Sequence, residues 1–240
     1  MMNYQPIGFI TSCFKEKFGT PRQPLLVPEA KALLKLRSDL NPVEALKGLE
    51  EFSHVWIIFD FHKNSNKQFN AKIYPPRLNG EKIGVFATRS PHRPNSIGIS
   101  AAKLDGIAGD TLYLSGVDII EGTPVLDLKP YLPEFDSVPL ATRGWVARAD
   151  NSSLTVQFAP EAKDQLGQYD PDGGKNLLKM IYRILQLDPR NPMDREETRQ
   201  GKPLGFFLSD FNVIFSVEGR VATVLRVETR REFDHRLMTT

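Results

Sequence analysis

FSHVWIIFDF, residues 52–61, is the stretch that decides the fold. Its aromatic and β-branched residues predict a strand in the middle of a sheet. Shorter stretches of similar character cover residues 4–12, 83–87, 97–104, 111–117 and 145–149. Turn formers rather than amphipathic helices separate most of these stretches, which favours an antiparallel barrel or sandwich over a doubly wound sheet. The sequence therefore predicts a mainly β N-terminal domain, with one short connecting helix over residues 41–52 that starts at Asn41 and Pro42.

The last third of the chain has a different pattern. Apolar residues recur at helical spacing within residues 174–190, and Pro189 is expected to end that helix. A strand and a helix are expected over residues 153–168, and a hairpin over residues 211–229 with its turn near Glu218 and Gly219. We therefore predict a barrel domain over residues 1–147 and a small α+β domain over residues 148–240.

Composition narrows the class of protein. Hydrophobic residues make up 40% of the 240 and charged residues 25%, as in a soluble globular protein. Cys13 is the only cysteine, which leaves no internal disulfide and no cysteine cluster for a metal. The sequence shows neither a signal peptide nor a membrane span, and we expect a cytoplasmic protein without a metal or a membrane partner.

Several function classes lack their signatures. The sequence contains no G-x-G-x-x-G, G-x-x-x-x-G-K-[ST], H-E-x-x-H or G-x-S-x-G pattern, which disfavours a Rossmann site, a P-loop, a zincin and a serine hydrolase. The net charge of +2 does not by itself indicate a nucleic-acid binder. Arginines recur over residues 220–236, but glutamates and aspartates alternate with them, which favours a solvated face.

ATRSPHRPNSIGIS, residues 87–100, is the most unusual segment. Its prolines fix φ, and Gly98 permits close backbone approach, so the segment is expected to be a stiff loop. Arginines on a stiff loop suit the recognition of a carboxylate or a phosphate. From spacing alone, a surface loop whose arginines pair with nearby carboxylates is an equal alternative.

The loop belongs to a wider set of motifs. FATRSPHRPNSIGIS (86–100) stands with PRQP (21–24), GLEEFSHVWIIFDFH (48–62), PPR (75–77) and GTPVLDLKPYLP (122–133). Together these motifs resemble the TsaA-like family, and LDPR (187–190) and DFNV (210–213) resemble its bacterial TrmO-type tRNA methyltransferases. The resemblance covers nearly the whole chain. Two residues depart from the usual motif. His92 stands where an aromatic or other residue is frequent, and Ser96 replaces a proline.

The resemblance implies a function. It implies a β-barrel enzyme that uses S-adenosylmethionine to methylate N6 of N6-threonylcarbamoyladenosine, next to the tRNA anticodon, and that works as a homodimer on the anticodon loop. The cofactor residues that it implies are Pro21, Arg22, Gln23, Phe61, His62, Lys63, Arg89, Gly116, Val117, Asp118 and Ile119. Candidates for substrate binding are Arg93, Asn95, Asp188, Arg190, Asp210 and Asn212.

Chemistry suggests how these residues divide the work. Arg22 or Arg89 is suited to hold the cofactor carboxylate, and Asp118 to accept from its ribose or amine. Backbone groups of Val117 or Ile119 are suited to read the adenine edge. His62 and His92 are able to act as bases near neutral pH, but the sequence does not assign a catalytic base. Two alternatives stay open, a module that binds the cofactor or RNA without catalysis, and a methyltransferase with another substrate.

Overall fold

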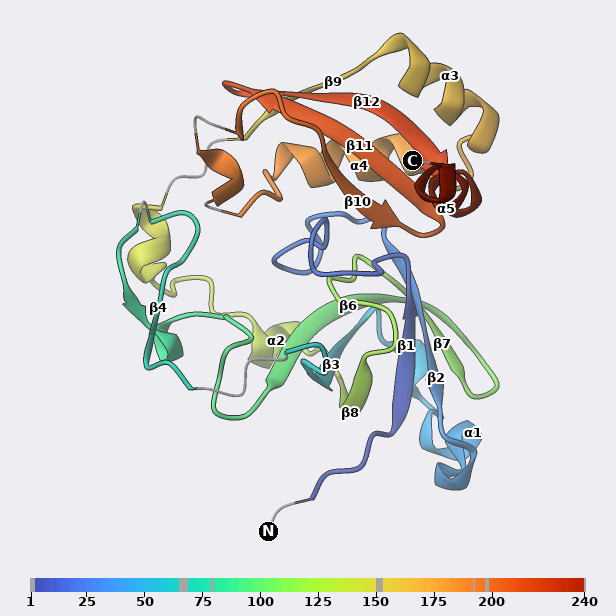
Figure 1. Ribbon diagram of the computed structural model, residues 1–240. Helices are drawn as coiled ribbons and strands as arrows, with labels where there is room; N and C mark the ends of the chain where they lie inside the picture. Colours follow the sequence, from blue (N-terminus) through green and yellow to red (C-terminus); the bar gives the residue numbers. More distant parts are fainter. Residues whose placement is uncertain are drawn as a thin grey trace. The chain divides into compact units, whose positions relative to one another are not determined.

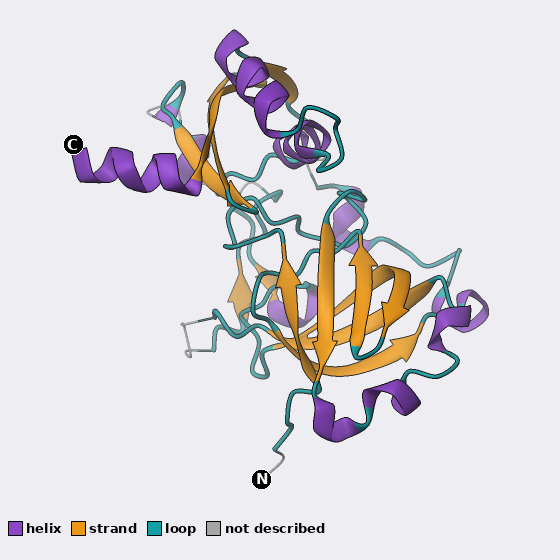
Figure 2. Ribbon diagram, turned by 90° about the vertical axis from the view of Figure 1, so that its right-hand side faces the viewer, coloured by secondary structure: helices purple, strands orange, loops and turns teal. Residues whose placement is uncertain are grey.

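The computed structural model describes residues 3–64, 69–78, 80–149, 153–191, 193–196 and 199–239, with side chains as far as residue 236 (Figures 1 and 2). The strands are β1 Gly8–Ser12, β2 Lys31–Leu36, β3 His54–Asp60, β4 Lys72–Ile73, β5 Ile83–Gly84, β6 Ile97–Ala108, β7 Thr111–Ser115, β8 Pro124–Pro130, β9 Thr155–Phe158, β10 Leu204–Leu208, β11 Phe211–Glu218 and β12 Val221–Thr229. The α-helices are α1 Pro42–Ala45, α2 Pro133–Asp136, α3 Pro160–Tyr169, α4 Leu177–Gln186 and α5 Arg230–Thr239. Short 3-10 helices are Ser38–Leu40, Leu49–Glu51, Val85–Ala87, Gly144–Ala147 and Met193–Arg195.

The chain divides into two compact units. The first consists of residues 1–11, 32–117 and 122–152, and the second of residues 12–31, 118–121 and 153–240. Each unit is therefore assembled from three separate stretches of chain.

A closed six-stranded barrel forms the first unit, in the order β1-β2-β7-β6-β3-β8. Strand β3 pairs antiparallel with β6 on one side and β8 on the other, as the central position predicted for residues 52–61 requires. Val55, Ile57 and Phe59 are buried and alternate with more exposed residues, so one face of β3 fills the barrel interior. The predicted mainly β fold with an N-terminal barrel is confirmed.

The second unit is built on a four-stranded sheet in the order β10-β11-β12-β9. Strands β10, β11 and β12 are antiparallel neighbours, while β9 runs parallel to β12. Helices α3 and α4 pack along this sheet (Figure 1). Their buried residues Leu166, Ile181 and Leu185 share a core with Val213 and Phe215. This arrangement confirms the small α+β domain expected at the C-terminal end.

Residues 12–31 contribute to the core of this second unit. Phe14 is 1% exposed and forms an isolated antiparallel bridge with Leu208, beside a hydrogen bond from Ser209 N to the Cys13 carbonyl of 2.6 Å. At Gly19, φ is +84° and an added Cβ would lie 2.5 Å from the ring of Phe206. Only glycine satisfies both conditions, because L side chains rarely adopt this φ.

Several local predictions were wrong. Residues 145–149 do not form a strand, since Gly144–Ala147 is a 3-10 helix. The expected helix over residues 41–52 is reduced to α1 and a 3-10 turn, and Asn41 has φ +48° and makes no side-chain cap. Residues 83–87 form strand only at β5, before a 3-10 turn. Strands β2, β4, β8 and β10 and helices α2 and α5 were not predicted from the sequence.

Helix length bears on the membrane expectation. Within the described ranges, no helix is both long and apolar enough to cross a bilayer.

Candidate functional site

The predicted loop of residues 87–100 is stiffened by its own hydrogen bonds. Thr88 Oγ1 donates to the Val85 carbonyl at 2.7 Å, and Ser90 Oγ accepts from His92 N at 3.2 Å. Trp145 Nε1 donates to the Ala87 carbonyl at 2.7 Å, which fixes the start of the loop. An added Cβ on Gly98 would lie 2.4 Å from the Phe59 ring, so this glycine allows the close approach predicted for it.

Arg93 points back onto this loop. Its Nη1 donates to the carbonyl oxygens of Thr88 at 2.9 Å and Val85 at 3.3 Å, and its guanidinium lies 5.6 Å from the centre of the Phe86 ring. These contacts give Arg93 a structural role in the loop. Arg89 and Asn95 are exposed on the same loop, where a ligand can reach their side chains.

Residues 61–63 follow β3 and lie beside the same loop. Phe61 N donates to the Ser96 carbonyl at 2.7 Å, and the side chain of Asn64 donates to the Pro91 carbonyl at 3.0 Å. His62 Nδ1 lies 3.4 Å from Thr123 Oγ1 at the start of β8. The first unit thus brings His62, Lys63 and the loop to one end of β3.

The environment of His62 favours its neutral form. Burial, followed by the positive charge of Lys63, lowers its pKa below the ordinary histidine value, and the charge and backbone of Asp60 oppose the shift. A neutral imidazole is the form that accepts a proton or a hydrogen bond. His62 is therefore a stronger candidate for an acceptor role than its sequence position alone indicates.

Residues 116–119 form an irregular buried segment after β7. Strand β7 ends at Ser115, and Gly116 has φ +70°, so the chain leaves the sheet there. Val117 and Ile119 are each 1% exposed, while Asp118 is partly exposed. The expected contact of this backbone with the adenine edge remains a prediction.

In the second unit, Arg22 is bonded to the LDPR motif. Its Nη2 donates to the carbonyl oxygens of Asp188 and Arg190, both at 3.3 Å. Pro21 is buried and Gln23 is partly exposed. One nitrogen of the Arg22 guanidinium is thereby engaged with backbone carbonyls, and the cofactor roles of Arg22 and Arg89 remain predictions.

Asp188 and Arg190 form a buried ion pair. Arg190 Nε and Nη2 donate to the two carboxylate oxygens of Asp188 at 2.8 and 3.1 Å, and Arg195 Nε lies 3.3 Å from Asp188 Oδ2. Asp188 and Arg190 are 9% and 7% exposed, and Asp188 has φ +50°. Asp188 and Arg190 are thus engaged with each other and with Arg22 and Arg195 inside the second unit.

Asp210 and Asn212 lie at the start of β11. Asp210 is exposed, and its carbonyl accepts from Arg230 N at 2.8 Å. Asn212 is 5% exposed, and its Nδ2 donates to Glu228 Oε1 at 2.9 Å. The binding roles assigned to the sequence candidates of either unit remain predictions. Sequence reasoning missed Thr123, Trp145 and Glu228, because their roles come from partners distant in the chain.

The barrel and the α+β unit correspond to two domains of one family. Residues 9–137 match the model of the tRNA-methyltransferase O N-terminal domain, and residues 151–230 match that of the TrmO C-terminal domain. The fold places the chain among proteins that join a closed six-stranded β-barrel to a small α+β unit rather than among those with a doubly wound sheet. The chain belongs to the tRNA-methyltransferase O family, as the resemblance found in the sequence predicted.

Three known proteins illustrate the likeness. The tRNA (adenine(37)-N6)-methyltransferase of Escherichia coli K12 is 39% identical over 232 residues, which cover 95% of this chain and 98% of that protein. The mouse protein of the same name is 58% identical over 135 residues, and the matched region spans only 31% of its length. The crystal structure of TrmO from Pseudomonas aeruginosa superposes with a TM-score of 0.77 at 38% identity, covering 95% of this chain and 98% of that one.

Proposed function

We propose that this protein is an S-adenosylmethionine-dependent methyltransferase that acts on N6 of the adenine at position 37 of tRNA. One observation carries the proposal, namely that the E. coli enzyme of that name aligns over almost the whole length of both chains. Both family domains also occur in this chain in order. An isolated barrel match would support a weaker proposal, since a barrel could bind a cofactor without catalysis.

The residues present suit the chemistry of the cofactor. S-adenosylmethionine carries a carboxylate, an amine, a ribose diol and an adenine, and supplies an activated methyl group when bound. Arg89 offers an exposed guanidinium on a stiff loop for the carboxylate, and Asp118 an acceptor for the amine or ribose. The backbone of residues 116–119 suits the adenine edge. The remaining cofactor candidates, Pro21, Arg22, Gln23, Phe61, His62 and Lys63, are proposed to shape the binding site.

The proposed substrate is the N6-threonylcarbamoyl form of this adenosine. Its nitrogen is a weak nucleophile, so the reaction needs alignment of the acceptor and removal of one proton. The lowered pKa of His62 leaves its ring neutral near neutral pH, the form that can accept a hydrogen bond. Among the substrate candidates, Asn95 and Asp210 are exposed and suited to direct contact. Arg93, Asp188, Arg190 and Asn212 are engaged within the fold and are proposed to support such contacts indirectly.

We also propose that the protein is a cytoplasmic homodimer. The barrel unit exposes large apolar side chains, with Phe86 73%, Phe135 81%, Val138 68% and Leu140 95% accessible. Contiguous exposed apolar patches commonly mark protein interfaces, and Phe135, Val138 and Leu140 lie close together in the chain. A second copy of the chain would cover them.

Nucleoside mass spectrometry tests the reaction. The purified protein is incubated with S-adenosylmethionine and either threonylcarbamoylated tRNA or the same tRNA without that modification. A gain of one methyl group on threonylcarbamoyladenosine alone is the expected result. Methylation of unmodified adenosine would replace the proposed substrate. Bound cofactor without turnover on either RNA would favour a binding module.

The cofactor site is tested separately by calorimetry. Arg89→Ala should weaken S-adenosylmethionine binding, and Arg143→Ala, which removes a charge from another exposed arginine of the same unit, should leave it unchanged. Equal affinities for both variants would move the carboxylate site away from Arg89.

A further inference from the structure

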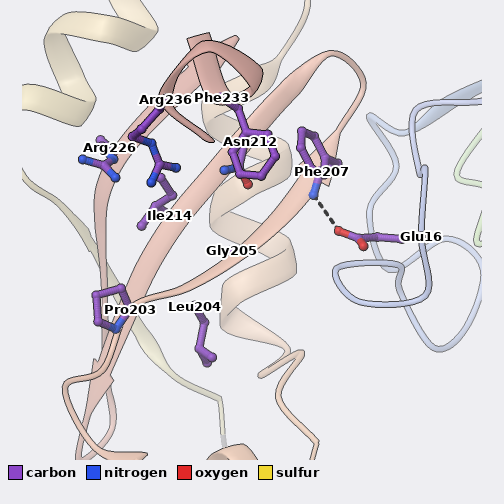
Figure 3. Close-up of a pocket in the computed structure, with 10 residues that line it drawn as sticks. All are labelled: Glu16, Pro203, Leu204, Gly205, Phe207, Asn212, Ile214, Arg226, Phe233 and Arg236. Atoms are coloured by element: carbon purple, nitrogen blue, oxygen red, sulfur yellow. Dashed lines mark hydrogen bonds between the residues drawn. The ribbon is translucent and has the colours of Figure 1, made fainter. Parts of the chain in front are cut away.

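The second unit contains a pocket whose lining includes Asn212 but none of the other residues proposed to bind the cofactor or the substrate. Its volume is about 350 Å³, and it lies between β10, β11, β12 and α5 (Figure 3). Six residues determine its chemistry, Gly205, Phe207, Asn212, Arg226, Phe233 and Arg236. Glu16 lies at its edge, where Oε1 accepts from Phe207 N at 3.0 Å.

A β-bulge directs Arg226 into this pocket. The register of β11 and β12 shifts between Ile214, which pairs with Arg226, and Phe215, which pairs with Val224. Val224 and Val227 are both fully buried, so the extra residue between the two pairs reverses the alternation of β12. Arg226 consequently lines the pocket, where strict alternation from Val224 would place it in the core, and Glu228 lies on the same face of β12.

Glu228 determines how its neighbours present their polar atoms. Its Oε1 accepts from Asn212 Nδ2 at 2.9 Å and from Arg236 Nη2 at 2.7 Å, and Arg226 Nε lies 4.0 Å from Oε2. An ionised carboxylate only accepts, so Asn212 must turn its nitrogen to Glu228 and its oxygen away. The amide oxygen lies 3.1 Å from the position of a Cβ built on Gly205, so this glycine leaves the acceptor accessible.

Two phenylalanine rings form the apolar part of the pocket. The centres of Phe207 and Phe233 are 5.2 Å apart and the rings are perpendicular, with an angle of 89°. The Arg230 guanidinium lies 4.4 Å from the centre of the Phe207 ring, and the Arg236 guanidinium lies 5.5 Å from that of Phe233. A flat ligand would stack on a ring by displacing one of these guanidiniums or on a face that they leave open, and would meet the edge of the other ring. The guanidinium groups of Arg226 and Arg236 lie next to each other beside these rings (Figure 3).

We infer that this pocket accepts an unpaired nucleobase of the RNA, a second contact apart from the methylated adenosine. This inference rests on the proposed function. A nucleobase combines a flat apolar face with an edge of mixed donors and acceptors, and RNA-binding proteins read such bases by stacking and edge hydrogen bonds. The Asn212 oxygen suits an amino group of a base, and the two guanidiniums suit its ring nitrogen or carbonyl. The carboxylates of Glu16 and Glu228 make the pocket less suited to a bare phosphate.

The solvated face predicted for the arginines of residues 220–236 therefore describes only part of them. Arg230, Arg231 and Arg236 belong to α5, and only Arg236 of these lines the pocket. Arg231 is exposed and outside the pocket lining, so it provides a control of equal charge on the same helix.

The first test measures RNA affinity of the full chain by fluorescence anisotropy. The probe is a labelled RNA hairpin with the sequence of a tRNA anticodon stem-loop. Phe207→Ala and Arg226→Gln should each weaken binding about tenfold, as loss of one stacking or edge contact does. Arg231→Gln should weaken RNA binding less than Arg226→Gln does. Phe207→Ala should leave the salt dependence of binding unchanged, because it removes no phosphate contact. Circular dichroism checks that each variant is folded.

The second test identifies the base by combining protein and RNA changes. Each loop nucleotide of the hairpin is replaced in turn by an abasic nucleotide. At one loop position, the abasic RNA should bind the unaltered protein about tenfold more weakly than the complete RNA does. The Phe207→Ala variant should bind both RNAs with nearly the same, reduced affinity, because the two changes remove the same contact. Additive losses at every loop position, or variants that bind like the unaltered protein, would overturn the inference. So would an unaltered protein that does not bind the hairpin.

Failure of this inference and failure of the proposed function give different results. A loop position is coupled to the pocket when the losses from its abasic RNA and from Phe207→Ala do not add. Methyl transfer to full-length tRNA, with no coupled position in the hairpin, overturns the pocket assignment alone. A coupled position in a protein that transfers no methyl group overturns the methyltransferase proposal alone.

Discussion

Asp188 is a motif residue whose side chain is bonded to other residues of the second unit. Its carboxylate is buried and contacts Arg190 and Arg195, while Arg22 binds the carbonyl oxygens of Asp188 and Arg190. The PRQP and LDPR motifs thus meet in one hydrogen-bonded cluster within the second unit. This contact gives both motifs a place in the fold that does not require either of them to touch RNA.

Arg190→Ala should destabilise the protein by about 3 kcal/mol, because it leaves the buried Asp188 carboxylate with fewer partners. Urea unfolding followed by circular dichroism measures the change. The double variant Asp188→Asn with Arg190→Met should lose less stability, since no buried charge is left over. An Arg190→Ala variant as stable as the parent would show that the pair contributes little.

His62 should titrate below the ordinary histidine pKa of about 6.5. Burial favours the neutral ring, so the folded protein binds fewer protons at this site than the unfolded chain. The contribution of His62 to stability is then complete above the ordinary pKa and is lost as pH falls from there through the folded pKa. NMR titration of the ring Cε1 proton checks the shift, with His62→Gln identifying the signal. A midpoint at or above the ordinary value would contradict it.

At the level of elements, regular alternation was predictable and irregular features were not. The aromatic and β-branched residues of 52–61 predicted β3 and its central place correctly. Trp145 was assigned to a strand on composition, yet it lies in a 3-10 turn and donates to the Ala87 carbonyl, a partner 58 residues away. The bulge before Arg226 leaves no signal in the sequence, since strand pairing creates it.

Helix α5 did leave a sequence signal that the analysis overlooked. Thr229 and Glu232 form a capping box, in which Glu232 Oε2 accepts from Thr229 N at 2.6 Å and Thr229 Oγ1 accepts from Glu232 N at 3.3 Å. The pattern T-x-x-E at residues 229–232 predicts a helix start there. The same holds for the candidate site. The sequence motifs located the loop of residues 87–100 and the other candidate segments. The hydrogen bonds of Arg93 and Arg22 to backbone carbonyls depend on the fold and could not be predicted.

Thr229→Ala should lower the free energy of unfolding by about 1 kcal/mol through loss of this cap. Because α5 carries Phe233 and Arg236, the same change should increase amide hydrogen exchange in α5 and weaken hairpin binding. Thr229→Ser keeps the hydroxyl and should preserve both properties. Unchanged exchange in Thr229→Ala would mean that packing alone holds the helix.

At the scale of the whole molecule, the exposed apolar side chains of the barrel unit bear on assembly. Leu140→Asp combined with Phe135→Asp should reduce the sedimenting mass from that of two chains to that of one, because charges would be buried at the interface. Asp136→Ala, which alters the same segment without adding charge there, should remain dimeric. A parent protein that sediments as a single chain at every concentration would refute the homodimer.

The three-part makeup of the second unit also affects its synthesis. Phe14 leaves the ribosome early, but its partner strand β10 ends at Leu208, 194 residues later (208 − 14). At about 5–20 residues per second, the first segment waits on the order of 10–40 s for its core partners. During that interval Phe14 and Phe18 lack the aromatic core that later covers them. Slow translation or an early stop would therefore leave a nascent chain that chaperones are expected to bind.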